Sequence, residues 1–336
     1  MEQRDLGRTG LRVSTLGYGA GAVGGLMVRG TPAEQTRAIA RAIDAGITYF
    51  DTAPGYGDGR SEENLGRALR DLDAWGRVVV GTKVRLRPAD LADPIPAIRR
   101  SCEASLRRLG HDAIDLIQLH NQIRRDPDGA TAATGESLPV DEVRGAITEG
   151  LGRLVGDGLA AHVGFTGLGD ADAMAALARD GRYATVQTYY NAVNPSAGAP
   201  GAAGGGQDFA GLLGTAAAHG VGVIVIRPLA AGALAGAPER HANAGDPGAP
   251  LAGGPGYAHD LDRARALAPL ARELGLESAL ELSLRFVQAH EGVSTVIVGY
   301  SDLTQLEDAI RWTARGPLPP WAAERVVALA RGDVAG

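Results

Sequence analysis

The chain has 336 residues, of which 45% are apolar and 21% charged, and its formal net charge is −6. This composition is typical of a globular protein with a large core, and the lack of a basic stripe argues against nucleic acid as a partner. No apolar run reaches the ~18 residues that span a bilayer, and residues 1–5 are charged, so we expect a cytoplasmic protein without membrane contact.

A strand followed by a helix is the repeating unit of the chain. Residues 3–14 precede the repeat and predict a β-hairpin that caps one end of the structure. Apolar runs predict strands at 15–19, 47–50, 78–82, 114–119, 162–165, 185–188, 221–226 and 295–298. Amphipathic stretches predict helices at 32–45, 61–69, 94–109, 139–155, 171–179, 212–219, 278–289 and 303–312. Such repetition gives a parallel sheet whose strand ends point the same way.

Eight units favour an α/β fold of the closed (β/α)8 TIM barrel type, in one domain over residues 1–336. The hairpin cap covers about 3–14, the barrel about 15–312 and a C-terminal tail about 313–336. A doubly wound sheet is the alternative, but its glycine-rich turn is matched poorly because Ala22 occupies the third glycine position. Long loops at 122–138, 196–207 and 237–257 are expected on the C-terminal face, either as flaps over a site or as plain insertions.

Four polar residues mark that face. Asp51, Lys83 and His120 each come directly after a predicted strand, and Tyr56 lies in the loop beyond the first of them. The C-terminal rim of a parallel barrel carries the chemistry of such folds. Taken singly, each residue has an ordinary structural interpretation, such as a helix cap for the aspartate or a solvated charge for the lysine. Their common position on one rim predicts a catalytic site.

Several motifs around these residues resemble those of the aldo-keto reductases. They are GITYFDTAPGYG at 46–57, SEENLGRAL at 61–69, GTK at 81–83, DLIQLH at 115–120 and RPLAAG at 227–232. The resemblance extends from about residue 6 to about residue 309. Within the family, residues 166–168 and 228–232 are most similar to the branch of aldose dehydrogenases that includes L-galactose dehydrogenase.

The resemblance implies an NAD(P)-dependent oxidoreductase that interconverts a carbonyl (an aldehyde, ketone or aldose) and an alcohol by hydride transfer. Tyr56 would be the general acid and base, and Lys83 would stabilise its phenolate and lower its pKa. Asp51 would hold Lys83, and His120 would donate a hydrogen bond to the substrate oxygen. Its partner would be a small carbonyl or alcohol substrate; the physiological substrate, the direction of reaction and the oligomeric state stay open.

Other functions are weighed against this one. A non-catalytic, nicotinamide-cofactor-binding regulatory subunit on the same barrel is the alternative. A barrel enzyme for phosphorylated metabolites would need a glycine-rich cradle after the last two strands, for which Gly299 alone is a poor candidate. No metal is expected, because the histidines show no metal-binding spacing and the single cysteine, Cys102, cannot form a thiolate cluster or an internal disulfide.

The same resemblance places a nicotinamide cofactor on the rim. Tyr190 would stack on the nicotinamide, with Gln187 and Asn191 nearby and Thr166 at the carboxamide. Gly19 and Asp51 are further expected contacts. The loop residues near the pyrophosphate would be Arg227, Leu229, Gly232 and Leu234, and Arg227 would pair with a phosphate. The adenine end would meet Gly299, Ser301, Gln305 and Asp308. NAD is weakly favoured over NADP, since no Lys or Arg lies between Gly299 and Ile310 and nearby carboxylates would repel a 2′-phosphate.

Overall fold

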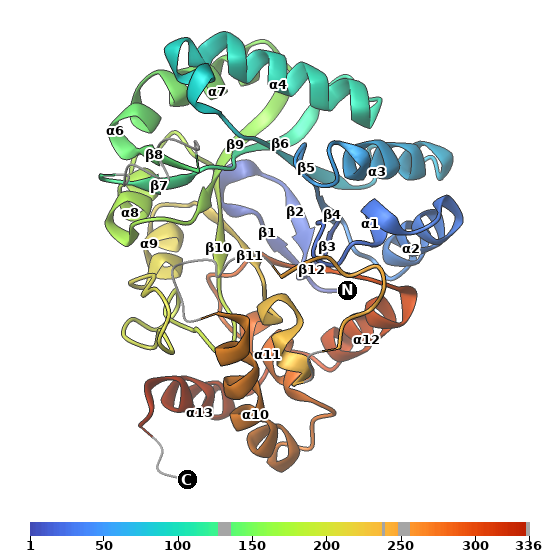
Figure 1. The fold of residues 1–336 in the computed structure, drawn as a ribbon, viewed down its shortest axis with the longest axis vertical. Helices are drawn as coiled ribbons and strands as arrows, with labels where there is room; N and C mark the ends of the chain where they lie inside the picture. Colours follow the sequence, from blue (N-terminus) through green and yellow to red (C-terminus); the bar gives the residue numbers. More distant parts are fainter. Residues whose placement is uncertain (127–135, 237–238, 248–255, 334–336) are drawn as a thin grey trace.

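The structure is a computed structural model that describes residues 1–126, 136–236, 239–247 and 256–333. Eight parallel strands close into a barrel (Figure 1). They are β3 (Leu16–Gly19), β4 (Tyr49–Asp51), β5 (Val79–Val84), β6 (Ile114–Leu119), β9 (Ala160–Gly167), β10 (Thr185–Tyr189), β11 (Gly222–Ile226) and β12 (Thr295–Gly299). Because β12 pairs with β3, the sheet closes on itself, which confirms the predicted (β/α)8 barrel and excludes a doubly wound sheet.

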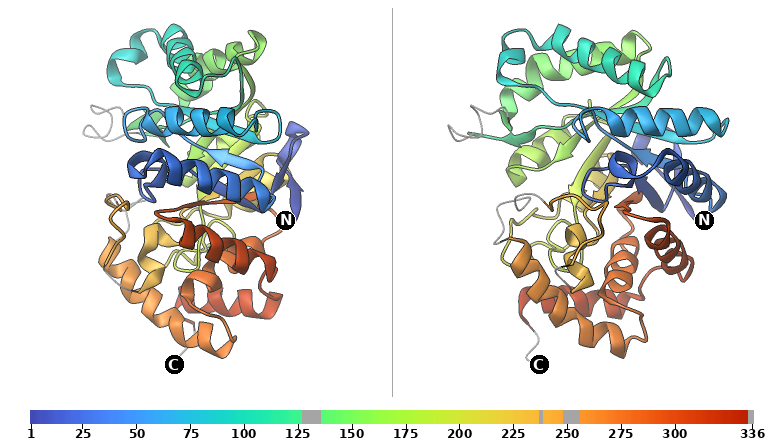
Figure 2. Two further views of the ribbon diagram at one scale, coloured as in Figure 1. Left: turned by 90° about the vertical axis from the view of Figure 1, so that its right-hand side faces the viewer. Right: turned by 45° about the vertical axis from the view of Figure 1, so that its right-hand side comes forward.

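Helices surround the barrel on its outer face, as Figure 2 shows from two further directions. They are α1 (Leu26–Arg29), α2 (Pro32–Asp44), α3 (Arg60–Asp71), α4 (Pro94–Leu109), α6 (Val140–Glu142), α7 (Thr148–Gly156), α8 (Ala171–Arg179), α9 (Leu212–Ala218), α10 (Tyr257–Glu273), α11 (Ala279–Gln288), α12 (Leu303–Ala314) and α13 (Pro320–Arg331). Short helical turns are η1 (Gly7–Thr9), η2 (Pro88–Ala92), η3 (Val143–Ile147) and η4 (Ala230–Ala235).

Helix α2 shows why these segments fold as they do. Its N-cap, Thr31, and Glu34 bond each other's backbone amides at 3.3 and 2.8 Å, and Pro32 occupies the first helical turn. The apolar residues Ala38 and Ile39 lie on the face that is buried against the barrel. Local capping therefore starts the helix, and burial of its apolar face holds it in place.

The N-terminal hairpin fills one end of the barrel. It consists of β1 (Gln3–Asp5) and β2 (Arg12–Ser14), which pair antiparallel. Leu6 and Val13 of this segment share an apolar cluster with four residues of the barrel strands, which are Tyr49, Leu116, Ile224 and Ile297. Arg8 also donates to the carbonyl oxygens of Gly181 and His219, at 2.7 and 3.2 Å. The predicted cap is confirmed, and it leaves the opposite, C-terminal rim for polar side chains.

Several predictions of element boundaries need correction. Asp51 is the last residue of β4 and Lys83 lies inside β5, so neither follows its strand as predicted. The helices α1, α10 and α13 were not expected from the sequence, and the segment predicted as one helix at 139–155 is divided by the π-helical turn η3. The short strands β7 (Gln122–Arg124) and β8 (Ser137–Pro139) border the predicted loop at 122–138. Parts of this loop (127–135) and of the loop at 237–257 (237–238 and 248–255) lie outside the described residues.

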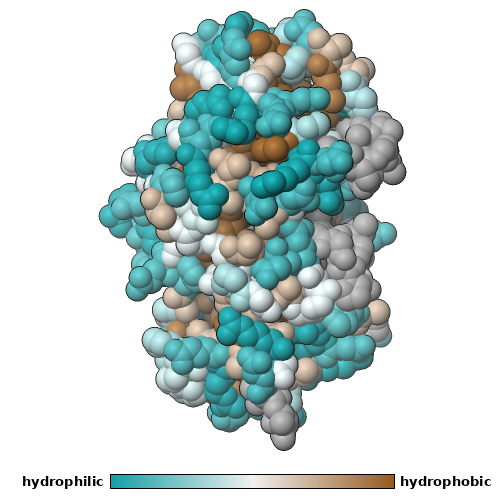
Figure 3. Space-filling view, turned by 90° about the vertical axis from the view of Figure 1, so that its left-hand side faces the viewer, coloured by the Kyte–Doolittle hydropathy of each residue, from teal (hydrophilic) through white to brown (hydrophobic). Residues whose placement is uncertain are grey.

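The outer surface is mainly hydrophilic on the side that lies at the left of Figure 1. In Figure 3, brown atoms on this side form only small, separate areas. The large apolar side chains that are exposed, such as Val155 and Trp321, are scattered rather than contiguous. Of the helices that the structure describes, none combines the length and apolar character needed to cross a bilayer.

Candidate active site

A buried ion pair forms the base of the site. The Lys83 ammonium donates to Asp51 Oδ1 at 2.5 Å and to the Thr52 carbonyl oxygen at 2.8 Å. The two charged side chains are 1% and 3% exposed, so water screens their attraction very little. Burial by itself lowers the pKa of Lys83, but the charge of Asp51 and the Tyr56 phenol outweigh it, and the lysine remains an ammonium.

Tyr56 faces this ammonium from the loop between β4 and α3. Lys83 Nζ lies 5.0 Å from the centroid of the Tyr56 ring and also interacts with the phenol oxygen. Burial raises the pKa of Tyr56, the charge of Lys83 opposes that shift, and the net direction is upward. The phenol therefore holds its proton at neutral pH, while the neighbouring cation reduces the free energy needed to release it.

His120 completes the group from the end of β6. Its ring is 5.9 Å from the Tyr56 ring, centroid to centroid, and stands nearly perpendicular to it at 86°. Burial and the nearby cations of Lys83 and Arg85 hold the pKa of His120 well below its usual value. The imidazole is therefore neutral at physiological pH, and its one N–H can donate a hydrogen bond while the other ring nitrogen can accept one. The structure thus brings together all four residues that the sequence indicated.

Supporting residues hold Asp51 in place, and among them the sequence had indicated only Gln187, in a different role beside the nicotinamide. Gln187 of β10 donates to Asp51 Oδ2, and the Tyr49 hydroxyl lies 3.4 Å from the same oxygen. Beside Lys83, Thr82 donates to Glu62 at 2.6 Å, and Glu62 accepts from Arg108 at 2.5 Å. Apart from the contact of Tyr49, these contacts join residues 20 to 136 positions apart, so no local sequence signal indicates them.

Comparison with known proteins shows the family of this chain. Residues 15–331 match the profile of the Aldo/keto reductase family. The chain belongs to this family. Its members are generally NAD(P)-dependent oxidoreductases, so the resemblance and the enzyme class inferred from the sequence are confirmed.

Relatives of this aldo-keto reductase cover almost its whole length. It is 28% identical to L-galactose dehydrogenase of Arabidopsis thaliana over 316 residues, which are 92% of this chain and 87% of that protein. It is 29% identical to a probable voltage-gated potassium channel subunit beta of Oryza sativa subsp. japonica, over 93% of this chain and 90% of the other. The solved holo form of an aldo-keto reductase from Bacillus halodurans has the same fold, with a TM-score of 0.71, 23% identity, and coverage of 100% of this chain and 98% of that one.

The aldo-keto reductase rim has features that fit a nicotinamide cofactor. The Thr166 hydroxyl is buried and has no hydrogen-bond partner among the described residues, so a ligand amide could satisfy it. Gly19 and Gly299 pair in register at the ends of β3 and β12, and Gly299 is exposed. Gly24 packs against this point so closely that a Cβ there would lie 2.5 Å from the Gly299 carbonyl carbon, so only glycine fits at position 24.

The loop after β11 has an unusual backbone. Arg227, Ala230 and Ala231 have φ of 51°, 47° and 57°, values that non-glycine residues rarely adopt, and Gly232 has φ of 97°. The Arg227 carbonyl accepts from Asn191 Nδ2 at 3.0 Å, so Asn191 supports this loop. The Leu229 side chain is half-buried, whereas that of Leu234 is buried in the core, which leaves only the Leu234 backbone for a ligand.

Polar groups at the expected adenine end are already bonded to one another. Ser301 donates its hydroxyl to the Gly24 carbonyl at 2.7 Å and its amide to Gln305 at 2.8 Å. The Asp308 carboxylate pairs with Arg311 at 2.7 Å. Glu307 similarly binds Arg41 through two bonds of 2.6 and 2.8 Å. The charges expected to repel a 2′-phosphate are therefore largely offset by cations from other parts of the sequence.

The expectation for Tyr190 is wrong in this structure. Its ring packs against Phe286 of α11 at 5.2 Å and against His290 at 5.8 Å, in the layer between barrel and helices. Side chains alternate along β10, and Gln187 points inward to Asp51, so Tyr189 shares the inward direction and Tyr190 does not. Gln187 itself lies at the rim but is engaged by Asp51 rather than left for a cofactor.

Metal ligands do not gather at this rim. Within residues 1–126, 136–236, 239–247 and 256–333, no group of three or more His, Cys, Asp or Glu side chains is arranged to hold a metal ion. The Cys102 thiol is buried, and burial raises its pKa to about 11.

Proposed function

We propose that this chain interconverts a small carbonyl compound and the corresponding alcohol, with Tyr56 as the general acid and base. One observation carries the proposal: the Lys83 ammonium is fixed by Asp51 and the Thr52 carbonyl while it faces the phenol of Tyr56. A phenol beside a buried cation is suited to donate and accept a proton, because the cation stabilises the phenolate that forms.

Each side chain has a distinct part in the proposed reaction. When bound, the nicotinamide cofactor supplies or takes up the hydride. During carbonyl reduction, Tyr56 donates its proton to the oxygen that becomes the hydroxyl, and Lys83 stabilises the resulting phenolate. Neutral His120 donates a hydrogen bond to the same oxygen and fixes its orientation. Asp51, supported by Gln187, prevents the lysine from turning away. In the oxidation direction the phenolate accepts the alcohol proton.

Residues of this chain that would hold the cofactor follow from the fit described above. Thr166 would bind the carboxamide through its unpaired hydroxyl, and the backbone at Gly19, Gly232 and Gly299 would contact the phosphates and the adenosine. We propose a weak preference for NAD. Most of the described cations near Ser301 are paired with carboxylates. Arg29 is a cation that lies near Ser301 without such a pair: it donates to the Asn243 carbonyl at 2.7 Å, and the Asn243 side chain donates to the Ser301 carbonyl at 3.0 Å. A strong preference is therefore not expected.

A non-catalytic cofactor-binding subunit is the second candidate, and the similarity to a channel subunit beta is compatible with it. Among the described rim residues no contact favours it over the enzyme, because Asp51, Lys83 and Tyr56 are all present and lie together. A site for phosphorylated metabolites is not favoured, because Gly19, Gly232 and Gly299 are proposed above to contact the cofactor.

Turnover separates these candidates. Purified protein is assayed with a panel of aldoses and simple aldehydes, each with NADH and NADPH, and cofactor binding is measured by fluorescence. Saturable, cofactor-dependent reduction of at least one aldehyde is expected. Tight cofactor binding with no turnover across the panel would favour the regulatory subunit. Binding of NADPH at least tenfold tighter than NADH would remove the proposed cofactor preference.

A further inference from the structure

The first turn of α3 is bonded to both halves of the proton-transfer site. Ser61 lies in this turn and is fully buried. Its amide donates to the Tyr56 carbonyl at 3.2 Å. Its hydroxyl lies 2.8 Å from the Thr52 hydroxyl and 2.8 Å from the Ala20 carbonyl. A single serine therefore joins the loop that carries Tyr56, the residue that follows β4 and the residue that follows β3.

The chemistry of the hydroxyl groups fixes the direction of these bonds. A serine hydroxyl has one proton, and a carbonyl oxygen can only accept, so Ser61 donates to the Ala20 carbonyl. The Thr52 hydroxyl must therefore be the donor in its bond with Ser61. The Thr52 amide in turn donates to the Gly81 carbonyl of β5 at 2.9 Å. Both donors of this buried threonine are thus engaged, one by α3 and one by the neighbouring strand, and its orientation is fixed.

The remaining polar group of Thr52, its carbonyl, is one of the two acceptors that hold the Lys83 ammonium. The ammonium donates to this carbonyl at 2.8 Å and to the Asp51 carboxylate at 2.5 Å. An ammonium has three donors in a fixed tetrahedral arrangement. With two of them bound, the direction of the third is determined, and Lys83 also interacts with the Tyr56 phenol. The position of the Thr52 carbonyl therefore influences how the cation meets the phenol.

We propose that Thr52 and Ser61 are positioning residues for the proton transfer, and that their hydroxyl pair sets the direction of the Lys83 ammonium toward Tyr56. The inference rests on the proposed function and extends it to two residues that do not touch the reacting atoms. Thr52 acts through its carbonyl on the lysine. Ser61 acts through Thr52 and, by its amide, on the loop of the phenol. Small misplacements of groups that take part in a reaction lower its rate strongly.

Thr52→Val tests the proposal, since valine keeps the shape of threonine and lacks the hydroxyl. Single-turnover reduction of an aldehyde accepted by the wild-type enzyme should slow about 10-fold, with an unchanged cofactor Kd. For oxidation of the corresponding alcohol, the midpoint of the pH–rate profile should move to higher pH by about half a unit, because a poorly directed ammonium stabilises the phenolate less. Thr52→Ser keeps the hydroxyl and should restore both the rate and the midpoint.

Ser61→Ala removes the same bond from its other side and serves as the second variant. It should change the rate and the pH midpoint in the same direction as Thr52→Val. The double variant Thr52→Val/Ser61→Ala should be no slower than the slower single variant, because both substitutions break one bond. A loss in the double variant equal to the product of the two single losses would show that the hydroxyls act independently, and would overturn the proposal.

Thr148→Val is the matched control. It also removes a buried threonine hydroxyl, which lies 2.7 Å from the Tyr183 hydroxyl before the start of β10, at the end of the barrel opposite the rim. It should lower stability and leave the rate and the pH midpoint unchanged. The same result for Thr52→Val, or a slower rate that Thr52→Ser does not restore, would overturn the proposal. The proposed function would then still stand on wild-type turnover and its loss in Tyr56→Phe, whereas no turnover of any aldehyde by the wild-type enzyme would remove both.

Discussion

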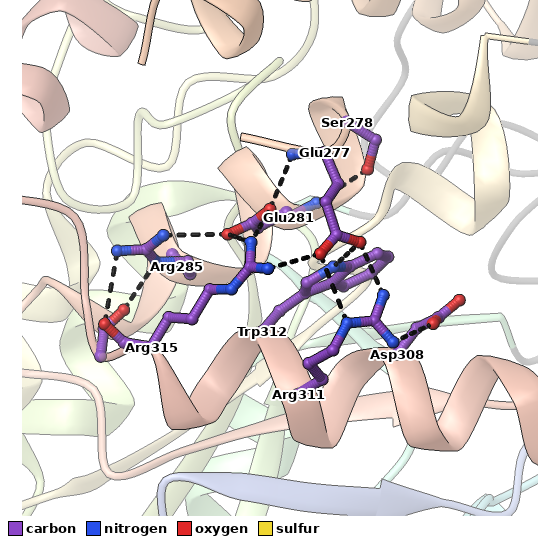
Figure 4. Close-up of polar contacts among 9 residues, drawn as sticks. Glu277, Ser278, Glu281, Arg285, Asp308, Arg311, Trp312 and Arg315 are labelled. Atoms are coloured by element: carbon purple, nitrogen blue, oxygen red, sulfur yellow. Dashed lines mark hydrogen bonds and ion pairs between the residues drawn. The ribbon is translucent and has the colours of Figure 1, made fainter. Parts of the chain in front are cut away.

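Two polar clusters in this protein differ in what they leave unpaired. The first, between α11 and α12, consists of Glu277, Glu281, Arg285, Asp308, Arg311, Trp312 and Arg315 (Figure 4). Glu281 is fully buried and accepts from Arg285 and Arg315, while Glu277 accepts from Arg311, Arg315 and Trp312. The second is the rim, where Asp51 and Lys83 are satisfied but the His120 imidazole, the Arg227 guanidinium and the Thr166 hydroxyl have no hydrogen-bond partners among the described residues.

The difference separates a structural network from a functional one. Where every donor meets an acceptor, a charged cluster fastens two helices and has no capacity left for a ligand. Where a strong ion pair supports unpaired donors on an exposed rim, the unused hydrogen bonds are available to substrate and cofactor. Shifted pKa values alone would not distinguish the structural cluster from the rim, because they occur in both.

Removing one partner of the rim ion pair should have the largest effect. Lys83→Met leaves Asp51 buried without its cation, which is expected to cost about 3–5 kcal/mol of unfolding free energy. It should also lower kcat about 100-fold or more, because Tyr56 loses its electrostatic support. The double variant Lys83→Met/Asp51→Asn, measured by urea unfolding and kinetics, should regain most of the stability and none of the activity. Recovery of activity in the double variant would contradict the role given to Lys83.

The network between α11 and α12 should respond in the opposite way. Glu281→Gln keeps the shape but removes the charge that two arginines share, with an expected loss of about 2 kcal/mol in unfolding free energy. Since Glu281 has no contact with the rim residues, kcat and KM should stay at wild-type values. A fall in kcat comparable to that of the Lys83 variant would show that the two clusters are not independent.

The smallest effect is expected from pH. Hydrogen bonds from Arg311 and Trp312 lower the pKa of Glu277 from its usual 4.5 to about 2. Its contribution to stability is therefore complete above pH 4.5 and is lost as the pH falls toward 2, because the unfolded chain binds the proton first. Unfolding free energy measured at several pH values should fall less steeply across this window in Glu277→Gln, with activity at neutral pH unchanged. Equal slopes would show that the pair contributes nothing.

Much of the barrel could be predicted because its signals are local. The strand β6 and the helices α4 and α8 have the bounds that apolar runs, Pro94 and Gly110 indicated. Lys83 was placed just beyond the predicted strand at 78–82 because a charged side chain interrupts the run, although β5 continues through it to Val84. The helix α10 was missed because it carries Pro269 in its interior and has weak amphipathic character.

From the sequence, only those candidate site residues that lie in short motifs could be predicted. Asp51, Tyr56, Lys83 and His120 lie in short motifs, whereas the bond from Gln187 to Asp51 joins residues 136 positions apart. The choice between Tyr189 and Tyr190 depends on which face of β10 points inward, and that follows only from the long-range contact of Gln187. The cations that offset Glu307 and Asp308, Arg41 and Arg311, come from outside the segment in which the sequence was searched for them.

Tyr56→Phe tests the central claim most directly, since it removes one hydroxyl and keeps the ring beside Lys83. Single-turnover reduction of an aldehyde accepted by the wild-type enzyme is followed together with cofactor binding. A fall in the rate of about 10²- to 10⁴-fold, the usual worth of a general acid, is expected with an unchanged cofactor Kd. Hydride transfer at the wild-type rate would contradict the assignment of Tyr56 as the proton donor.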